Sequence, residues 1–256
     1  MPAGSIKAII AGLIVALGLG HAPAPQPDRL GLPQLVLWSW DRADDLHFID
    51  PADTGVAYLA GTIRLAADGL AIVPRRNPLL LPPGAATLAV IHIALDRAQP
   101  PVLDDAARGR LVAAILALRP ADSAALQIDF EVAQSQQSFL AATIRALRQK
   151  LPETPLSMTA LSSWCLNETW LDALPVDEVV PMLFRLGPDR LRIATHFSAG
   201  GDFGDARCRD SFGIATDEMR RNAFDAPRLA GRRAYVFAAA PWTANTYATI
   251  RREFAP

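Results

Sequence analysis

The feature that most constrains the fold is a regular alternation of short β-rich runs with helical stretches. Eight such runs lie at 34–40, 56–65, 87–95, 125–132, 155–163, 178–184, 211–216 and 234–240. Helical patterns cover 104–118, 135–150 and 245–254, and Asp104 and Ser135 are the expected N-caps of the first two. This alternation is typical of a parallel sheet built from βα units.

Eight strands within roughly 210 residues predict one (β/α)8 barrel over 34–256, on the small side of the usual ~250 residues. The second βα unit is irregular, because 41–86 shows no helical pattern and contains AIVPRRNPLLLPPG. We expect a β-rich excursion there. An open doubly wound sheet is the alternative fold, although its fingerprint GxGxxG is missing.

The N-terminus carries an apolar run from Ala8 to Gly20. This run is shorter than the ~20 residues of a membrane-spanning helix and suits a signal peptide. Pro25 follows a possible cleavage site at 22–24, so residues 1–24 are expected to be either a signal peptide or an uncleaved anchor. The proline-rich residues 25–33 read as an extended tether. We therefore expect an exported protein, periplasmic or secreted; a buried N-terminal helix is the alternative.

Composition excludes several classes of function. The net charge of -1 gives no electrostatic case for a nucleic-acid binder. The four histidines form no HxxxH or HExxH, and two cysteines are too few for an all-cysteine zinc site. No GxSxG or phosphate-loop motif occurs. We expect no cofactor and no metal, and the sequence leaves the oligomeric state open.

The fourth β-rich run alternates apolar and polar side chains. One face carries Leu126, Ile128, Phe130 and Val132; the other carries Gln127, Asp129 and Glu131. In a barrel the polar face looks into the lumen, and its last residues reach the C-terminal mouth where active sites lie. Glu131 is the candidate general acid if burial and Asp129 raise its pKa. A carboxylate pair bound to an arginine for structure is the other interpretation.

Further polar residues fall on neighbouring strands. His92 would project into the lumen beside Asp129, although a lone histidine is more often a hydrogen-bonded core residue. Asp217 follows the seventh strand at the same predicted end of the barrel. Both are candidate substrate-binding residues, and at least one of them is expected within about 8 Å of the carboxylate pair.

Tryptophans gather at predicted strand ends: Trp38, Trp40, Trp164 and Trp242. Sugar rings have apolar faces that stack on aromatic planes. Each tryptophan alone could be an ordinary core residue, but the clustering indicates a carbohydrate site.

The run LQIDFE resembles the fourth-strand motif DxxDxDxE of the chitinase-like glycoside hydrolases, which are (β/α)8 barrels. Asp129 and Glu131 match its last two acids, whereas Ala124 and Gln127 replace the first two. The resemblance implies that Glu131 protonates the leaving oxygen. It implies that Asp129 orients an acetamido group of the substrate, which acts as nucleophile.

The resemblance extends to two other motifs of these hydrolases. PMLFRLG resembles the sixth-strand MxYD, with Met182 and Phe184 as loose matches and Arg185 in place of the aspartate. Trp242 matches the tryptophan at the end of strand eight. Met182 and Arg185 therefore join the candidate substrate-binding residues.

Residues 34–243 resemble more strongly a family of bacterial proteins with no assigned activity. The shared segments are LWSWDR, PRRNPL, QIDFE, LSMTALSSWC and VVPMLFRLG, in this order.

These patterns leave three hypotheses. The first is an envelope or secreted glycoside hydrolase with Glu131 as general acid. The second is a barrel that binds a glycan without cleaving it, favoured by the missing acids and by Arg185, since an arginine can bind a sugar carboxylate or hydroxyls in a bidentate manner. The third is a structural or partner-binding envelope protein, which can be membrane-associated if its N-terminus is uncleaved.

Cys165 and Cys208 are the only cysteines, and export would permit a disulfide between them. The predicted strands place them at opposite ends of the barrel, about 17 Å apart and beyond the ~7 Å Cα limit of a disulfide. A bridge requires the glycine-rich segment 199–204 to carry Cys208 over the mouth. Both outcomes stay open.

Overall fold

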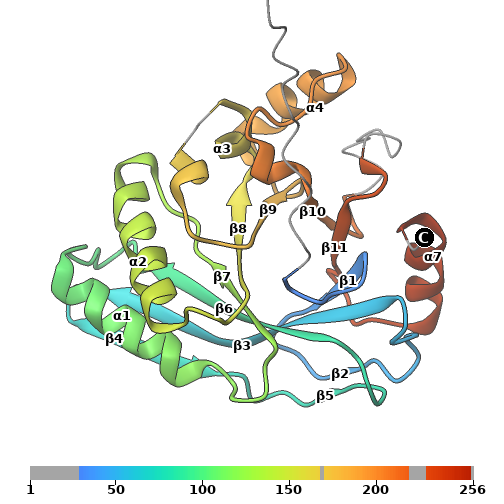
Figure 1. Cartoon of the computed structure of the whole chain (residues 1–256), viewed down its shortest axis with the longest axis horizontal. Coiled ribbons are helices and arrows are strands. Elements are labelled where there is room, and N and C mark those ends of the chain that lie inside the picture. The colour runs from blue at the N-terminus through green and yellow to red at the C-terminus, as the bar shows by residue number, and fades with distance from the viewer. Residues whose placement is uncertain (1–28, 168–169, 219–228, 255–256) are drawn as a thin grey trace, which may run out of the picture.

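A computed structural model describes residues 29–167, 170–218 and 229–254 of the chain. Its central feature is a closed barrel of eight parallel strands (Figure 1). In barrel order these are β1 (Leu35–Ser39), β3 (Thr54–Ala66), β6 (Thr87–Leu95), β7 (Ala125–Asp129), β8 (Leu156–Leu161), β9 (Glu178–Met182), β10 (Ser211–Ala215) and β11 (Arg233–Phe237). Pairing of β11 with β1 closes the circle, which confirms the predicted (β/α)8 barrel.

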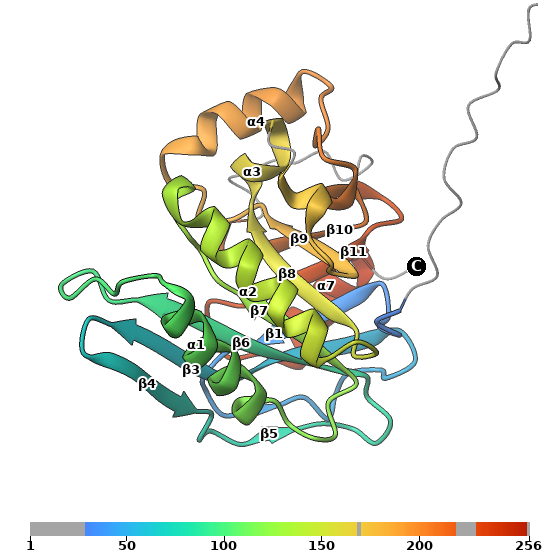
Figure 2. The same ribbon diagram turned by 60° about the vertical axis from the view of Figure 1, so that its left-hand side comes forward.

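The helices lie outside the strands (Figures 1 and 2). They are α1 (Asp105–Leu118), α2 (Gln137–Lys150), α3 (Ser162–Asn167), α4 (Arg190–Ser198) and α7 (Ala244–Phe254), with short 3-10 turns η1 (Gln134–Gln136), η2 (Trp170–Ala173), η3 (Gly187–Asp189) and η4 (Ala206–Arg209). The Asp104 carboxylate accepts the Ala107 N–H and caps α1 as predicted (2.7 Å). Ser135 is not an N-cap, because it lies inside η1 and α2 begins only at Gln137.

The irregular second unit is the expected β-rich excursion. β3 continues beyond the end of β1, stays paired with β6 as far as Leu65, and pairs antiparallel with β4 (Gly69–Pro74). The chain then forms β5 (Leu79–Leu80), which pairs with β2 (Asp44–Asp45) from the loop after β1. The excursion therefore reaches back to the loop that follows β1.

Alternation along the strands divides the apolar side chains between two cores. The larger core lies between strands and helices and includes Leu126, Ile128, Phe130 and Val132. The smaller core fills the lower lumen with side chains such as Val36, Leu88, Val90, Val180 and Tyr235. The face assignment predicted for 125–132 is therefore confirmed, and it directs Gln127 and Asp129 inward.

Residues 29–33 belong to the barrel and do not stand off from it as a tether. Leu30 and Leu32 are buried with the lumen residues. Arg233 Nη2 donates to the Leu32 carbonyl and Arg233 Nε to the Pro33 carbonyl (3.0 Å each). The predicted signal peptide or anchor at 1–24 lies outside the described residues. Among the described helices, none has the length and apolar character needed to cross a membrane.

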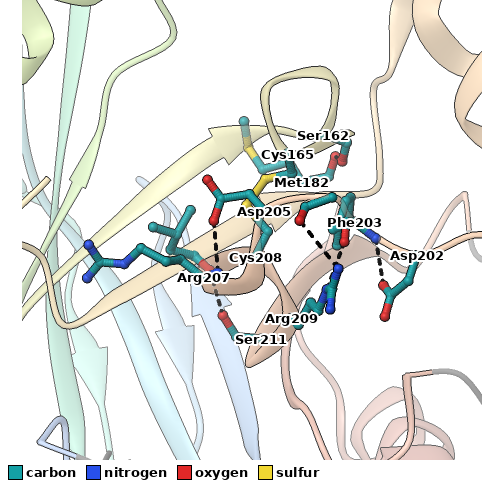
Figure 3. The surroundings of a disulfide bond; sticks show 12 residues. Ser162, Cys165, Met182, Asp202, Phe203, Asp205, Arg207, Cys208, Arg209 and Ser211 are labelled. Carbon is teal, nitrogen blue, oxygen red and sulfur yellow. Dashed lines mark hydrogen bonds between the residues drawn. A yellow bond between two sulfur atoms is a disulfide. The ribbon is translucent and has the colours of Figure 1, made fainter. Parts of the chain in front are cut away.

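A disulfide joins Cys165 of α3 to Cys208 of η4, with 5.9 Å between the Cα atoms (Figure 3). The two segments also meet through the backbone, since Asp205 N–H donates to the Cys165 carbonyl (3.1 Å). Gly204 permits this approach, because a Cβ there would lie 2.4 Å from the Leu166 carbonyl oxygen. The segment before β10 thus carries Cys208 to α3, so the predicted strand-length separation does not hold.

Candidate functional site

A cavity of about 800 Å³ opens at the carboxyl ends of the barrel strands. Its wall is formed by residues from several strands and the loops that follow them, including Trp38, Trp40, Arg42, His92, Gln127, Asp129, Glu131, Thr159, Met182, Phe184, Arg185 and Phe237. This is the end of a (β/α)8 barrel at which active sites lie. The inward-facing side chains of several strands therefore line one cavity.

Asp129 is held in the wall by its two neighbouring strands. Strand register places His92 of β6 opposite Asp129, and Thr159 follows the β8 residue that pairs with Ile128. His92 Nδ1 is hydrogen-bonded to Asp129 Oδ2 (2.8 Å), and Thr159 Oγ1 donates to Asp129 Oδ1 (2.7 Å). Both carboxylate oxygens therefore have a partner, and the Asp129 side chain is fixed.

The charge state of His92 follows from this contact. Burial opposes protonation of the imidazole, but the hydrogen bond to Asp129 and the negative charges of Asp129 and Glu131 outweigh it. The pKa of His92 is raised above its ordinary value. His92 and Asp129 thus form an ion pair whenever the imidazole is protonated.

Glu131 lies just beyond β7, on the same side of the chain as Asp129. Its side chain reaches solvent within the cavity, yet the surrounding walls remove enough water to raise its pKa. The charge of Asp129 raises the pKa further, while His92, Arg185 and Arg97 oppose the shift. A carboxyl with a raised pKa retains its proton closer to neutral pH, as a general acid requires.

Below the carboxylates, a chain of hydrogen bonds forms the floor of the cavity. Trp38 Nε1 donates to Gln127 Oε1 (3.1 Å), and Gln127 Nε2 donates to Ser157 Oγ (3.0 Å). Ser157 Oγ donates in turn to Glu178 Oε2 (2.9 Å). Gln127, a candidate substrate-binding residue, lines the cavity but has both ends of its amide engaged in this floor.

The floor rests on a buried ion pair. Arg233 Nη1 lies 2.6 Å from Glu178 Oε1, and Tyr235 Oη donates to Glu178 Oε2 (2.6 Å). Only 9% of the Arg233 side chain and 3% of the Glu178 side chain are exposed. The ion pair therefore links the cavity floor to the residues 29–33 beneath the barrel.

Aromatic side chains form one wall of the cavity. Phe184 and Phe237 are stacked with 5.8 Å between ring centroids and 4° between planes. Trp40 contacts Phe237 edge-on (6.2 Å) and His92 edge-on (5.5 Å). Trp38 lies tilted against Phe184 (6.0 Å). This apolar wall beside two carboxyl groups suits a ring with an apolar face and polar edges, such as a sugar.

The loop carrying Trp40 is held by Arg75, which the sequence did not single out as a site residue. Arg75 follows β4 and donates to the carbonyls of Ser39, Trp40 and Arg42. Asn77 donates to Asp41 in the same loop (3.0 Å). The excursion thus shapes the rim of the cavity, although Arg75 does not line it.

Three of the sequence-predicted binding residues do not line the cavity. Trp164 is buried in the outer core against Trp170 (5.2 Å), because β8 ends at Leu161 and α3 turns its side chain away from the lumen. Trp242 is buried and donates Nε1–H to the Trp38 carbonyl (3.0 Å). Asp217 lies exposed on the turn after β10.

The other predicted binding residues, Trp38, Trp40, His92, Gln127, Met182 and Arg185, all line the cavity with Asp129 and Glu131. The sequence missed Arg42, Thr159 and Phe237 there. Thr159 carried a usable signal, because it alternates in phase with Ser157 on a strand next to β7. Within the described residues, no cluster of three or more histidine, cysteine or acidic side chains could hold a metal ion.

Comparison with protein-family models and with curated proteins gives no match. Among solved structures, the chain is similar to a fungal endo-beta-N-acetylglucosaminidase from glycosyl hydrolase family 18. The sequence identity is 15% and the TM-score is 0.49, with 87% of this chain and 97% of that chain covered.

Proposed function

We propose that this protein acts on a glycan as a glycoside hydrolase. The observation that supports the proposal most strongly is the placement of Glu131 and Asp129 in one cavity beside the aromatic wall. Trp40 offers a stacking surface for a sugar ring, and the carboxyl groups lie in the same cavity. The match of both acids to the chitinase-like motif agrees with these roles.

Glu131 is the proposed general acid. As Glu131 gives its proton to the glycosidic oxygen, the bond from that oxygen to the anomeric carbon breaks and the acetamido oxygen of the substrate bonds to this carbon. Water later displaces the acetamido oxygen, and the Glu131 carboxylate takes the proton of the water. Asp129 is the residue proposed to orient the acetamido group of the substrate, and its own side chain is held by His92 and Thr159. Its charge also favours the protonated form of Glu131.

A screen of the full chain for release of reducing ends from polysaccharides and oligosaccharides tests this proposal. Glu131→Gln should lower turnover by about 10²–10⁴-fold, the usual contribution of a general acid, while the affinity for the same glycan is kept. Glu153→Gln is the matched control, because Glu153 is exposed and lies outside the cavity lining. Equal turnover of the wild type and Glu131→Gln would contradict the catalytic role.

A glycan-binding barrel without hydrolysis is the second candidate. The specific observation in its favour is that each oxygen of Asp129 already has a hydrogen-bond partner, so an amide of the substrate would have to share an oxygen with His92 or Thr159. In that case the screen detects binding without product. Binding should then be lost on substitution of Trp40 and kept on substitution of Glu131.

We also propose that the protein works in an oxidising compartment outside the cytoplasm. The apolar N-terminal run and the disulfide between Cys165 and Cys208 support this location. Alkylation of the denatured, unreduced protein purified from its natural host should find no free thiol. Two reactive thiols would contradict the proposal.

A further inference from the structure

Arg185 has an unusual setting at the cavity wall. It lies just after β9 with φ of 51°, a left-handed conformation that is uncommon for residues other than glycine. Its N–H donates to Glu218 Oε2 (3.0 Å), and its guanidinium carbon lies 4.9 Å from the centroid of the Phe237 ring. Glu218 therefore holds the backbone of Arg185, and the guanidinium lies over the Phe237 ring at the cavity wall.

The guanidinium of Arg185 retains donors that could bind a ligand. The guanidinium carbon lies over the Phe237 ring, and the guanidinium N–H donors make no hydrogen bond to another described residue. Within the described part of the chain, no ion pair includes Arg185. Arg42, the other arginine of the lining, has an ion pair with Asp44 (3.2 Å) and donates Nη1–H to the Ala238 carbonyl (2.9 Å), while its buried Nη2 has no hydrogen-bond partner.

The carboxylates that line the cavity have other partners or another role. Asp41 accepts a hydrogen bond from Asn77 (3.0 Å). Asp129 is bound by His92 and Thr159, and Asp189 pairs with Arg192 (3.0 Å). The positive charge of Arg185 acts to lower the pKa of the Glu131 carboxyl. A positive charge there opposes protonation of the proposed general acid, unless an anion bound with the substrate cancels it.

Resting on the proposed function, we infer that the cavity takes a glycan bearing a carboxylate, and that Arg185 binds this group. A planar guanidinium matches a carboxylate through two parallel hydrogen bonds. The sugar ring packs against Trp40, and its acidic substituent reaches Arg185, which lies over the neighbouring Phe237 ring. A ligand carboxylate also offsets the effect of Arg185 on Glu131.

Isothermal titration calorimetry with the full chain tests this inference with three matched probes. The first is the neutral tetramer of N-acetylglucosamine. The second is the tetrasaccharide of alternating N-acetylglucosamine and N-acetylmuramic acid, whose added lactyl group carries the carboxylate. The third is the same tetrasaccharide with that carboxylate converted to an amide. The wild type should bind the acidic probe about 10-fold to 100-fold more tightly than the amide, the range of a hydrogen bond to a charged group.

Variants of Arg185 test whether this residue causes the preference for the acidic probe over its amide. Arg185→Gln should bind the acidic probe and the amide equally, and Arg185→Lys should keep only part of the preference, because lysine lacks the planar fork. Arg190→Gln, at an exposed residue of α4 outside the cavity lining, should behave like the wild type. Thermal unfolding of each variant checks that the fold is kept.

The outcomes separate this inference from the proposed function. Equal affinity of the wild type for all three probes overturns the carboxylate preference and leaves a neutral glycan as the substrate. A preference that survives in Arg185→Gln overturns the role of Arg185. Failure of every glycan to bind, here and in the polysaccharide screen, overturns the proposed function and this inference with it.

Discussion

Arg233→Met should be among the most destabilising single substitutions in the barrel. It leaves Glu178 without its cation although only 3% of the Glu178 side chain is exposed. Removal of one partner of a buried ion pair costs about 3–5 kcal/mol. The carbonyls of Leu32 and Pro33 also lose the Arg233 donors, so residues 29–33 should be held less firmly against the barrel.

Differential scanning calorimetry and urea unfolding measure this cost. At about 2–4 °C per kcal/mol for a chain of this size, Tm should fall by roughly 6–20 °C. Arg233→Met combined with Glu178→Gln should recover part of the loss, since no unpaired charge remains buried. Arg108→Met is the control, because its ion pair with Asp105 is exposed and should contribute little. A Tm within 2 °C of the wild type for Arg233→Met, or no recovery in the double variant, would refute this reasoning.

Three further predictions concern the disulfide, the contact of Gly213 with Trp38, and the ion pair of His92 with Asp129. Replacing Cys165 and Cys208 by serine should cost about 4 kcal/mol in the chain-entropy model for a separation of 43 residues, and an unchanged urea midpoint would contradict it. Gly213→Ala should destabilise by roughly 1–3 kcal/mol and alter the near-UV circular dichroism, because its Cβ would lie 2.8 Å from the Trp38 ring; an unaltered spectrum would argue against this contact. The raised pKa of His92 contributes stability fully below its ordinary value of 6.5, and this contribution is lost as pH rises through the raised value. The difference in unfolding free energy between the wild type and His92→Asn should therefore shrink over that range, and a difference independent of pH would count against the ion pair.

The sequence was sufficient where local periodicity decides the structure. Alternation along 125–132 directed Asp129 and Glu131 to the lumen side, and the runs at 87–95 and 211–216 gave strands within one residue of the observed ends. These strands are buried on both faces, so an apolar pattern bounded by polar residues marks them clearly.

The sequence was insufficient where contacts between distant segments decide the structure. The sequence pattern predicts that Trp164 ends a strand at the mouth, but β8 ends at Leu161 and α3 directs the Trp164 ring into the outer core. Arg75 gave no signal as a site residue, because its effect on the Trp40 loop depends on the pairing of β2 with β5. The disulfide depended on the close approach that Gly204 permits.

The most direct test of the central claim compares two leaving groups in Glu131→Gln. A general acid is needed when the leaving oxygen is a sugar hydroxyl, and it is hardly needed when the leaving group is a dinitrophenolate, which departs without a proton. With the glycan identified by the screen and its dinitrophenyl glycoside, the account predicts a loss of at least ~100-fold in kcat/KM on the glycan and little loss in kcat/KM for release of dinitrophenolate. The comparison uses kcat/KM because this ratio reports the first bond cleavage and not the later step in which Glu131 takes the proton of water. Equal losses on both substrates, or no loss on either, would contradict the claim that Glu131 is the general acid.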